Sequence, residues 1–136
     1  MPCKPTVQER RLSLAGQPLR LALHACTAGD QTWSLAVADV TDPAQVGAVL
    51  QVLVRAAGVN VAAAEQQVLP LVVPGATPNP ASQMVAYQGK LPDGQAVHMQ
   101  VAVFAHGTRV FQATALGPAL PAEGVQTFMG SIRFAD

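Results

Sequence analysis

Residues 19–39, LRLALHACTAGDQTWSLAVAD, hold two alternating segments separated by a turn. Apolar residues occupy every second position over 19–25 and again over 33–37. A period of two is typical of a strand with one buried face. Ala28-Gly29-Asp30 supplies turn residues between the segments. The sequence therefore predicts two antiparallel strands, and this pair decides the fold class.

The flanking residues extend this pair in both directions. On the N-terminal side, residues 6–14 form a further expected strand, joined by the turn at residues 15–18. On the C-terminal side, Thr41-Asp42-Pro43 begins a helix, because Thr41 or Asp42 can cap its first turn and proline suits the first helical position. Apolar residues at spacings of three and four predict this helix over 43–57, with Gly58 as its C-cap.

The second half of the chain repeats the strand signal. Residues 59–67 are ambiguous, because Ala62-Ala63-Ala64-Glu65 favours helix, whereas residues 68–73 are strand-like despite Pro70. Three more strands are expected at 84–90, 96–105 and 109–116, with turns at Pro92-Asp93-Gly94 and His106-Gly107-Thr108. A last helix begins at 120–123, with Val125, Phe128, Met129 and Ile132 on its inner face.

This order predicts an α+β fold in a single domain over residues 1–136. Three strands, a helix, three or four strands and a final helix make an antiparallel sheet of six to seven strands with two main helices packed on it. Half of the residues are hydrophobic and only 12% are charged, so the chain can bury a proper core.

The composition excludes several classes of function. The formal net charge is zero and no basic patch occurs, so nucleic-acid binding is not expected. No segment approaches the roughly 18–20 apolar residues of a membrane helix. No signal peptide is visible, so we expect either a cytosolic protein or one whose leader has been removed. A surface of low charge also favours self-association, which makes a homodimer one expectation.

Few residues are candidates for catalysis or metal binding. His24, His98 and His106 would serve a small hydrolase or metal-dependent enzyme if at least two of them converged. His24 and Cys26 are only an i, i+2 pair, whereas zinc sites use three or four ligands in tight local pairs. No G-x-S-x-G or phosphate-binding glycine pattern occurs, and Asp42 is better explained as a helix cap. The sequence predicts no catalytic residue, no metal and no cofactor.

One loop is a candidate for recognition. Residues 74–80 combine three prolines with a glycine, so they neither donate a full set of backbone hydrogen bonds nor fit a strand. Exposed loops of this kind often carry binding residues, although a plain connector is the alternative. The candidate recognition residues are Pro74, Gly75, Thr77, Pro78, Asn79 and Pro80.

Three features of the chain resemble the superfamily of the photosystem II extrinsic protein PsbP and its bacterial lipoprotein-like relatives. They are the proline-containing start before a meander, the central segments VPGATPNP, YQGKLPDG and VHMQVAVFAHGTRVFQATALG after the helix, and the closing FMGSIRF, in which a helix ends in a short strand. The resemblance implies an α/β/α sandwich and an accessory, assembly or binding role. It also implies export, so a periplasmic or otherwise extracytoplasmic location is expected.

Export bears on the two cysteines of the chain. In an exported protein, Cys3 and Cys26 would most simply form a disulfide. Antiparallel pairing of the first two strands brings the start of one near the end of the other, so the bond is feasible. Two reduced, partly buried thiols are the alternative.

Together these observations favour a non-catalytic binding or accessory module with an unknown protein or small-molecule partner. The histidine-based enzyme is the alternative from another functional class. A homodimer formed through an exposed sheet face or edge is the third.

Overall fold

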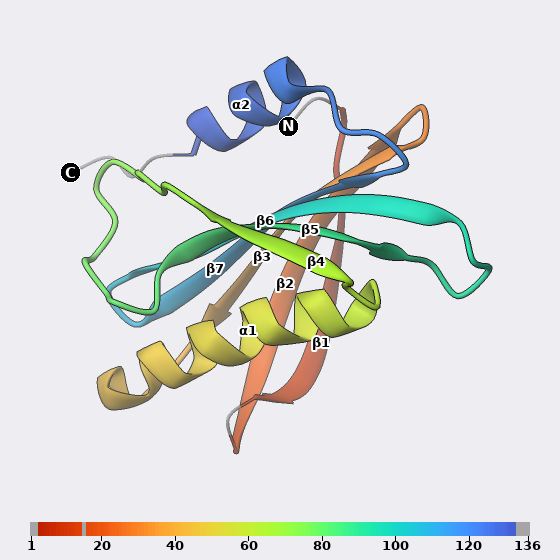
Figure 1. The fold of residues 1–136 in the computed structure, drawn as a ribbon. Helices are drawn as coiled ribbons and strands as arrows, with labels where there is room; N and C mark the ends of the chain where they lie inside the picture. The colour runs from red at the N-terminus through yellow and green to blue at the C-terminus, as the bar shows by residue number, and fades with distance from the viewer. Residues whose placement is uncertain (1–2, 15, 133–136) are drawn as a thin grey trace.

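The computed structural model describes residues 3–14 and 16–132, which form one antiparallel sheet with a helix on each face (Figure 1). The elements are β1 (Thr6–Leu14), β2 (Gln17–Ala28), β3 (Gln31–Asp39), a 3-10 turn (Pro43–Gln45), α1 (Val46–Asn60), β4 (Glu65–Leu69), β5 (Gln83–Lys90), β6 (Ala96–His106), β7 (Arg109–Gly117) and α2 (Ala122–Gly130). The predicted α+β class and antiparallel sheet are confirmed.

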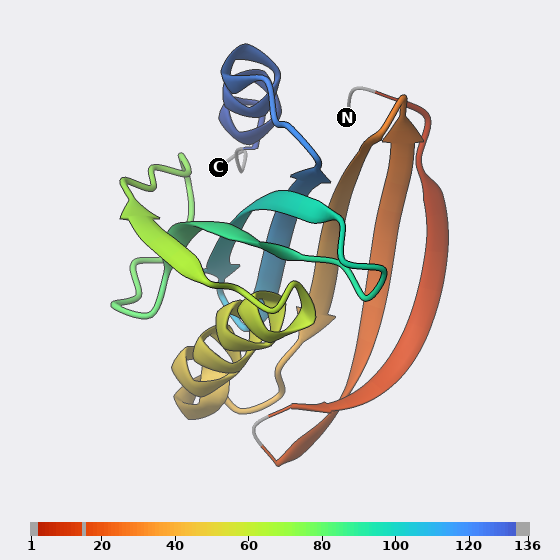
Figure 2. The same ribbon diagram turned by 45° about the vertical axis from the view of Figure 1, so that its right-hand side comes forward.

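The sheet consists of two meanders that meet at its centre. Its strand order is β1-β2-β3-β7-β6-β5-β4 and every neighbouring pair is antiparallel. The expected β1-β2-β3 meander is therefore present, and β7 pairs with β3 to join it to the second half of the chain. Figure 2 shows the strong twist between the two ends of the sheet. The edges of the sheet are β1 and β4.

The turn that joins β5 to β6 lies where the sequence predicts it. The backbone N–H of Gln95 donates to Asp93 Oδ1 at 2.9 Å, and Gly94 has a φ of 85°. Glycine reaches this left-handed conformation without a Cβ penalty, so the Pro92-Asp93-Gly94 sequence closes the hairpin.

The helical segment begins at Pro43 as predicted, first as the 3-10 turn and then as α1 from Val46, and it ends later than predicted. Asp42 Oδ1 accepts a hydrogen bond from the backbone N–H of Ala44 at 3.0 Å, which is the expected cap. The predicted C-cap at Gly58 is wrong, because α1 continues to Asn60. Gly58 is buried, and a Cβ there would lie 3.0 Å from the ring of Tyr87. Close packing against Tyr87 therefore explains this glycine.

The segment after α1 also differs from its prediction. The alanine run at 62–64 does not continue the helix, since Ala62 has a φ of 46° and the chain turns there. The strand expected at 68–73 is instead β4 at Glu65–Leu69. Pro70 cannot donate to a sheet ladder, which accounts for the end of the strand at Leu69.

Each helix covers its own hydrophobic core. One core joins α1 to the sheet face that carries Val101, Val103 and Ala105, all of which are fully buried. The other joins α2 to the opposite face through Phe128, whose ring centroid lies 5.3 Å from that of Trp33. The β6 face that carries the histidines is therefore covered by a helix at its middle. The short strand expected at the end of FMGSIRF (128–134) extends into residues 133–136, which lie outside the described residues, and neither Ser131 nor Ile132 is in a strand.

Candidate functional site

The three histidines lie on the α2 face of the sheet but far apart. His98 and His106 stand near opposite ends of β6, about 27 Å from each other at 3.4 Å per residue. His24 is on β2, and β3 and β7 separate it from β6, which is about 14 Å along the sheet. Among the residues that the structure describes, no group of three or more His, Cys, Asp or Glu side chains could hold a metal ion. The histidines therefore do not meet at a common centre.

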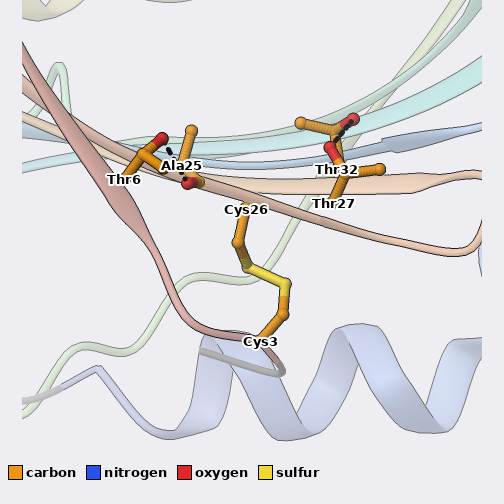
Figure 3. Close-up of a disulfide and its surroundings, with 6 residues drawn as sticks. All are labelled: Cys3, Thr6, Ala25, Cys26, Thr27 and Thr32. Atoms are coloured by element: carbon orange, nitrogen blue, oxygen red, sulfur yellow. Dashed lines mark hydrogen bonds between the residues drawn. A yellow bond between two sulfur atoms is a disulfide. The ribbon is translucent and has the colours of Figure 1, made fainter.

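The two cysteines form the disulfide expected of them. Cys3 and Cys26 are bonded, with their Cα atoms 5.8 Å apart, and no described cysteine is free. Figure 3 shows the bond between the chain just before β1 and strand β2, on the side of α2. The hydroxyl of Thr6 donates to the carbonyl oxygen of Ala25 at 3.2 Å beside it. The disulfide thus pins the start of β1 to the core beneath α2.

The proline loop at 74–80 is held against the end of the β6–β7 hairpin. The backbone N–H of Thr77 donates to the carbonyl of Ala105 at 2.8 Å, and Thr77 Oγ1 accepts from the backbone N–H of Gly107 at 2.8 Å. His106 Nδ1 lies 3.0 Å from the carbonyl oxygen of Gly75. Through these contacts His106 and Thr77 hold the loop against the hairpin. A recognition role for the loop stays a prediction.

A pocket of about 520 Å³ opens on the α2 face of β4, β5 and β6. We call it the polar pocket. Its volume is within the range typical of small-molecule sites, about 300–1,000 Å³. The sheet forms its floor, and the connection from β7 to α2 forms one wall. Its lining residues are Glu65, Gln66, Gln67, Ala86, Tyr87, Gln88, His98, Met99, Gln100, Ala119 and Leu120.

The strand register explains why polar side chains gather in the polar pocket. Gln88 pairs with Glu65 on one side and with His98 on the other. Gln67 and Gln100 flank Ala86 in the same way, two residues further along the strands. Residues paired directly across antiparallel strands project from the same face of the sheet. Two adjacent rows therefore face the pocket: Glu65, Gln88 and His98 form one, and Gln67 and Gln100 with the small Ala86 between them form the other.

These groups determine what the polar pocket can bind. Each glutamine amide offers two N–H donors and a carbonyl acceptor, and neither end ionises. Glu65 is the one Asp, Glu, Lys or Arg residue in the lining. The lining contains no Lys or Arg to attract an anion. The chemistry thus matches an uncharged or cationic group with several hydrogen-bonding atoms.

A second cleft, also about 520 Å³, runs between α2 and the end of the β2–β3 hairpin. Trp33 lies in its lining, and its buried Nε1 has no hydrogen-bond partner among the described residues. The α2 hydroxyls that face the cleft are occupied, since Thr127 donates to the carbonyl of Glu123 and Ser131 to that of Phe128. Its remaining polar lining residues are Gln31 and Glu123, so this cleft offers fewer polar side chains than the polar pocket and is the weaker candidate.

Comparison of the chain with known protein families and with curated proteins finds no match. Of the helices within the described residues, none has the length and apolar character needed to cross a membrane.

Sequence reasoning recognised only part of the polar pocket. The strand predicted at 96–105 contains His98 and Gln100, whereas the sequence signal at residues 59–67 is ambiguous. Glu65 and Gln67 therefore had no predicted neighbours. The sequence signal that could have indicated the pocket is that Gln88 and His98 are both polar and each lies on a strand whose opposite face is apolar.

Proposed function

We propose that this chain is a non-catalytic binding or accessory module of the PsbP-like superfamily that works in the periplasm or otherwise outside the cytoplasm. Its binding site is the polar pocket, and the group it holds is uncharged or basic. The single observation that carries the proposal is the convergence of Gln67, Gln88 and Gln100 with Glu65 and His98 around one opening. Convergent polar groups in a pocket of this size are typical of a ligand site.

Several features support binding rather than catalysis. No Ser, Thr, Cys or Lys lines the polar pocket, so its lining supplies none of these nucleophiles. The phenol of Tyr87 is used elsewhere, because it donates to the carbonyl of Val54 on α1 at 3.0 Å. His98 is half-buried, and its neighbour across the strands is the neutral amide of Gln88. Neutral amides orient a bound group without exchanging protons with it.

Other features support the compartment and the family. A disulfide persists in oxidising compartments and is rare in the cytosol, and Cys3–Cys26 is such a bond. The element order of three strands, a helix, four strands and a helix agrees with the arrangement that the resemblance implies.

Calorimetric titration with three capped amino acids tests the proposal. The N-acetyl, N-methylamide derivatives of lysine, asparagine and glutamate share one backbone and differ in charge. We expect lysine and asparagine derivatives to bind at one site and the glutamate derivative to bind least, because Glu65 repels it.

The matched variants for this titration are Gln88→Ala and Gln8→Ala. Both glutamines are exposed strand residues, but only Gln88 lines the polar pocket. Gln88→Ala should weaken binding several-fold, since each hydrogen bond contributes about 0.5–1.5 kcal/mol, and Gln8→Ala should not. Absence of binding by all three compounds, or equal effects of the two variants, would contradict the proposal, as would turnover of the bound compound.

A further inference from the structure

The two edges of the sheet differ in how they are protected. An edge strand presents unpaired backbone N–H and C=O groups, and natural proteins often place charges there to prevent pairing. The edge strand β1 carries three consecutive exposed charged residues, Glu9, Arg10 and Arg11. The edge strand β4 carries one, Glu65, and exposes Val68 to 66%. Of the two edges, β4 is the less protected.

The open edge of β4 adjoins the polar pocket. Three consecutive residues of β4, Glu65, Gln66 and Gln67, line the pocket. On the opposite face, Val68 pairs with Val85 of the α1 core and leaves most of its own side chain exposed. A strand placed beside β4 would thus meet a polar, acidic pocket on one face and an apolar side chain on the other.

We propose that β4 accepts an extended segment of a partner protein as an eighth strand, with a basic side chain of that segment in the polar pocket. This inference rests on the proposed function and names its partner. Backbone hydrogen bonds to β4 supply the attachment, and alternate side chains supply the specificity. A lysine or arginine entering the pocket meets the Glu65 carboxylate and the amide carbonyl oxygens of Gln67 and Gln88.

The same geometry defines the bound segment. Its side chains alternate between the two faces of the extended sheet, so basic or polar residues alternate with apolar ones that pack on Val68. Pro70 donates no hydrogen bond and follows directly after Leu69, so the paired length is close to the five residues of β4. A short interface of this kind gives weak, reversible association.

A second copy of this chain fits the edge less well. The sequence of β4 is EQQVL, which contains no basic residue. Pairing two β4 strands would therefore leave both Glu65 carboxylates without a cation from the partner strand. Charge complementarity favours a basic segment of another protein.

The test uses four capped heptapeptides and the intact, oxidised protein. The first alternates valine with lysine, and the second alternates valine with glutamate. The other two are N-methylated forms of the lysine peptide, one methylated at every valine and one at every lysine. Binding is followed by calorimetry and by amide hydrogen exchange of β4 and β1.

We expect the lysine peptide to bind at least about tenfold more tightly than the glutamate peptide, a difference of about 1.4 kcal/mol. At least one of the two N-methylated peptides should lose about tenfold in affinity, because its methyl groups replace the N–H donors that face β4. Exchange should slow at β4 amides and stay unchanged at β1. Glu65→Gln should reduce the preference for lysine, whereas the matched variant Glu9→Gln on β1 should leave it intact.

The proposal is overturned if both N-methylated peptides bind as tightly as the unmethylated lysine peptide, or if protection from exchange appears at β1 instead of β4. The proposal would also be overturned if the free protein formed a dimer in which the β4 amides are protected from exchange, because a second copy would then occupy the edge. If the capped lysine compound still binds the polar pocket while the peptides do not add a strand, this inference fails and the proposed function stands. If neither binds, both fail.

Discussion

Reduction of the Cys3–Cys26 disulfide should destabilise the protein by about 3 kcal/mol. The bond joins residues separated by 23 positions, and closing a loop of this length in the unfolded chain lowers its entropy by an amount worth about 3 kcal/mol at 25 °C. Urea unfolding with and without reductant measures the effect. With a slope of about 1–3 kcal/mol per molar urea, the midpoint should fall by about 1–3 M.

The loss of stability on reduction should also be uneven along β1. The disulfide lies beside the Thr6–Ala25 end of the β1–β2 pair, whereas Ser13 pairs with Pro18 beside the turn at the other end. After reduction, amide hydrogen exchange should accelerate most near Thr6, because an untethered chain end frays. Equal urea midpoints in the two redox states would refute the reasoning. So would two reactive thiols in the unfolded, unreduced protein.

Three further changes test the packing that positions the site. Gly89→Ala should destabilise the protein strongly, since the added Cβ would overlap the carbonyl oxygen of Val61, and thermal melting would measure the loss. Tyr87→Phe should cost about 1 kcal/mol in urea unfolding, because it removes the hydrogen bond to the Val54 carbonyl. Burial raises the pKa of Tyr87 above 10.0, so the folded state holds this proton more tightly than the unfolded state. Stability should therefore fall as pH rises above 10.0 in the parent, and less so in Tyr87→Phe. Phe128→Ala should cost about 3–5 kcal/mol and alter tryptophan fluorescence, because this ring packs against the tryptophan of β3.

Most strands of the sheet could be predicted because burial imposes a pattern on them. In β6, Val97, Met99, Val101 and Val103 all face the α1 core, so the alternation is visible in the sequence. The helix α1 shows its apolar face for the same reason. Where one face of a strand or helix is buried, the spacing of the apolar residues on that face reveals whether the segment is a strand or a helix.

The edge strand could not be predicted, because little of it is buried. In β4 the first four residues are exposed, so EQQVL carries no alternating apolar signal. The alanines at 62–64 favour helix intrinsically, but the backbone N–H of Ala64 donates to the carbonyl of Gln88 on β5. A contact between distant segments thus decides the local structure. The polar pocket depends on that contact, so most of the site remained hidden in the sequence.

The side-chain amide signals of the glutamines test the central claim most directly. Gln67, Gln88 and Gln100 line the polar pocket, whereas Gln8 on β1 and Gln112 on β7 do not. During titration with N-acetyl-lysine N-methylamide, NMR spectra should show the side-chain amides of Gln67, Gln88 and Gln100 shifting together with one dissociation constant, while those of Gln8 and Gln112 stay unchanged. Shifts of Gln8 and Gln112 equal to those of the pocket amides, or no shift in the pocket, would contradict the account.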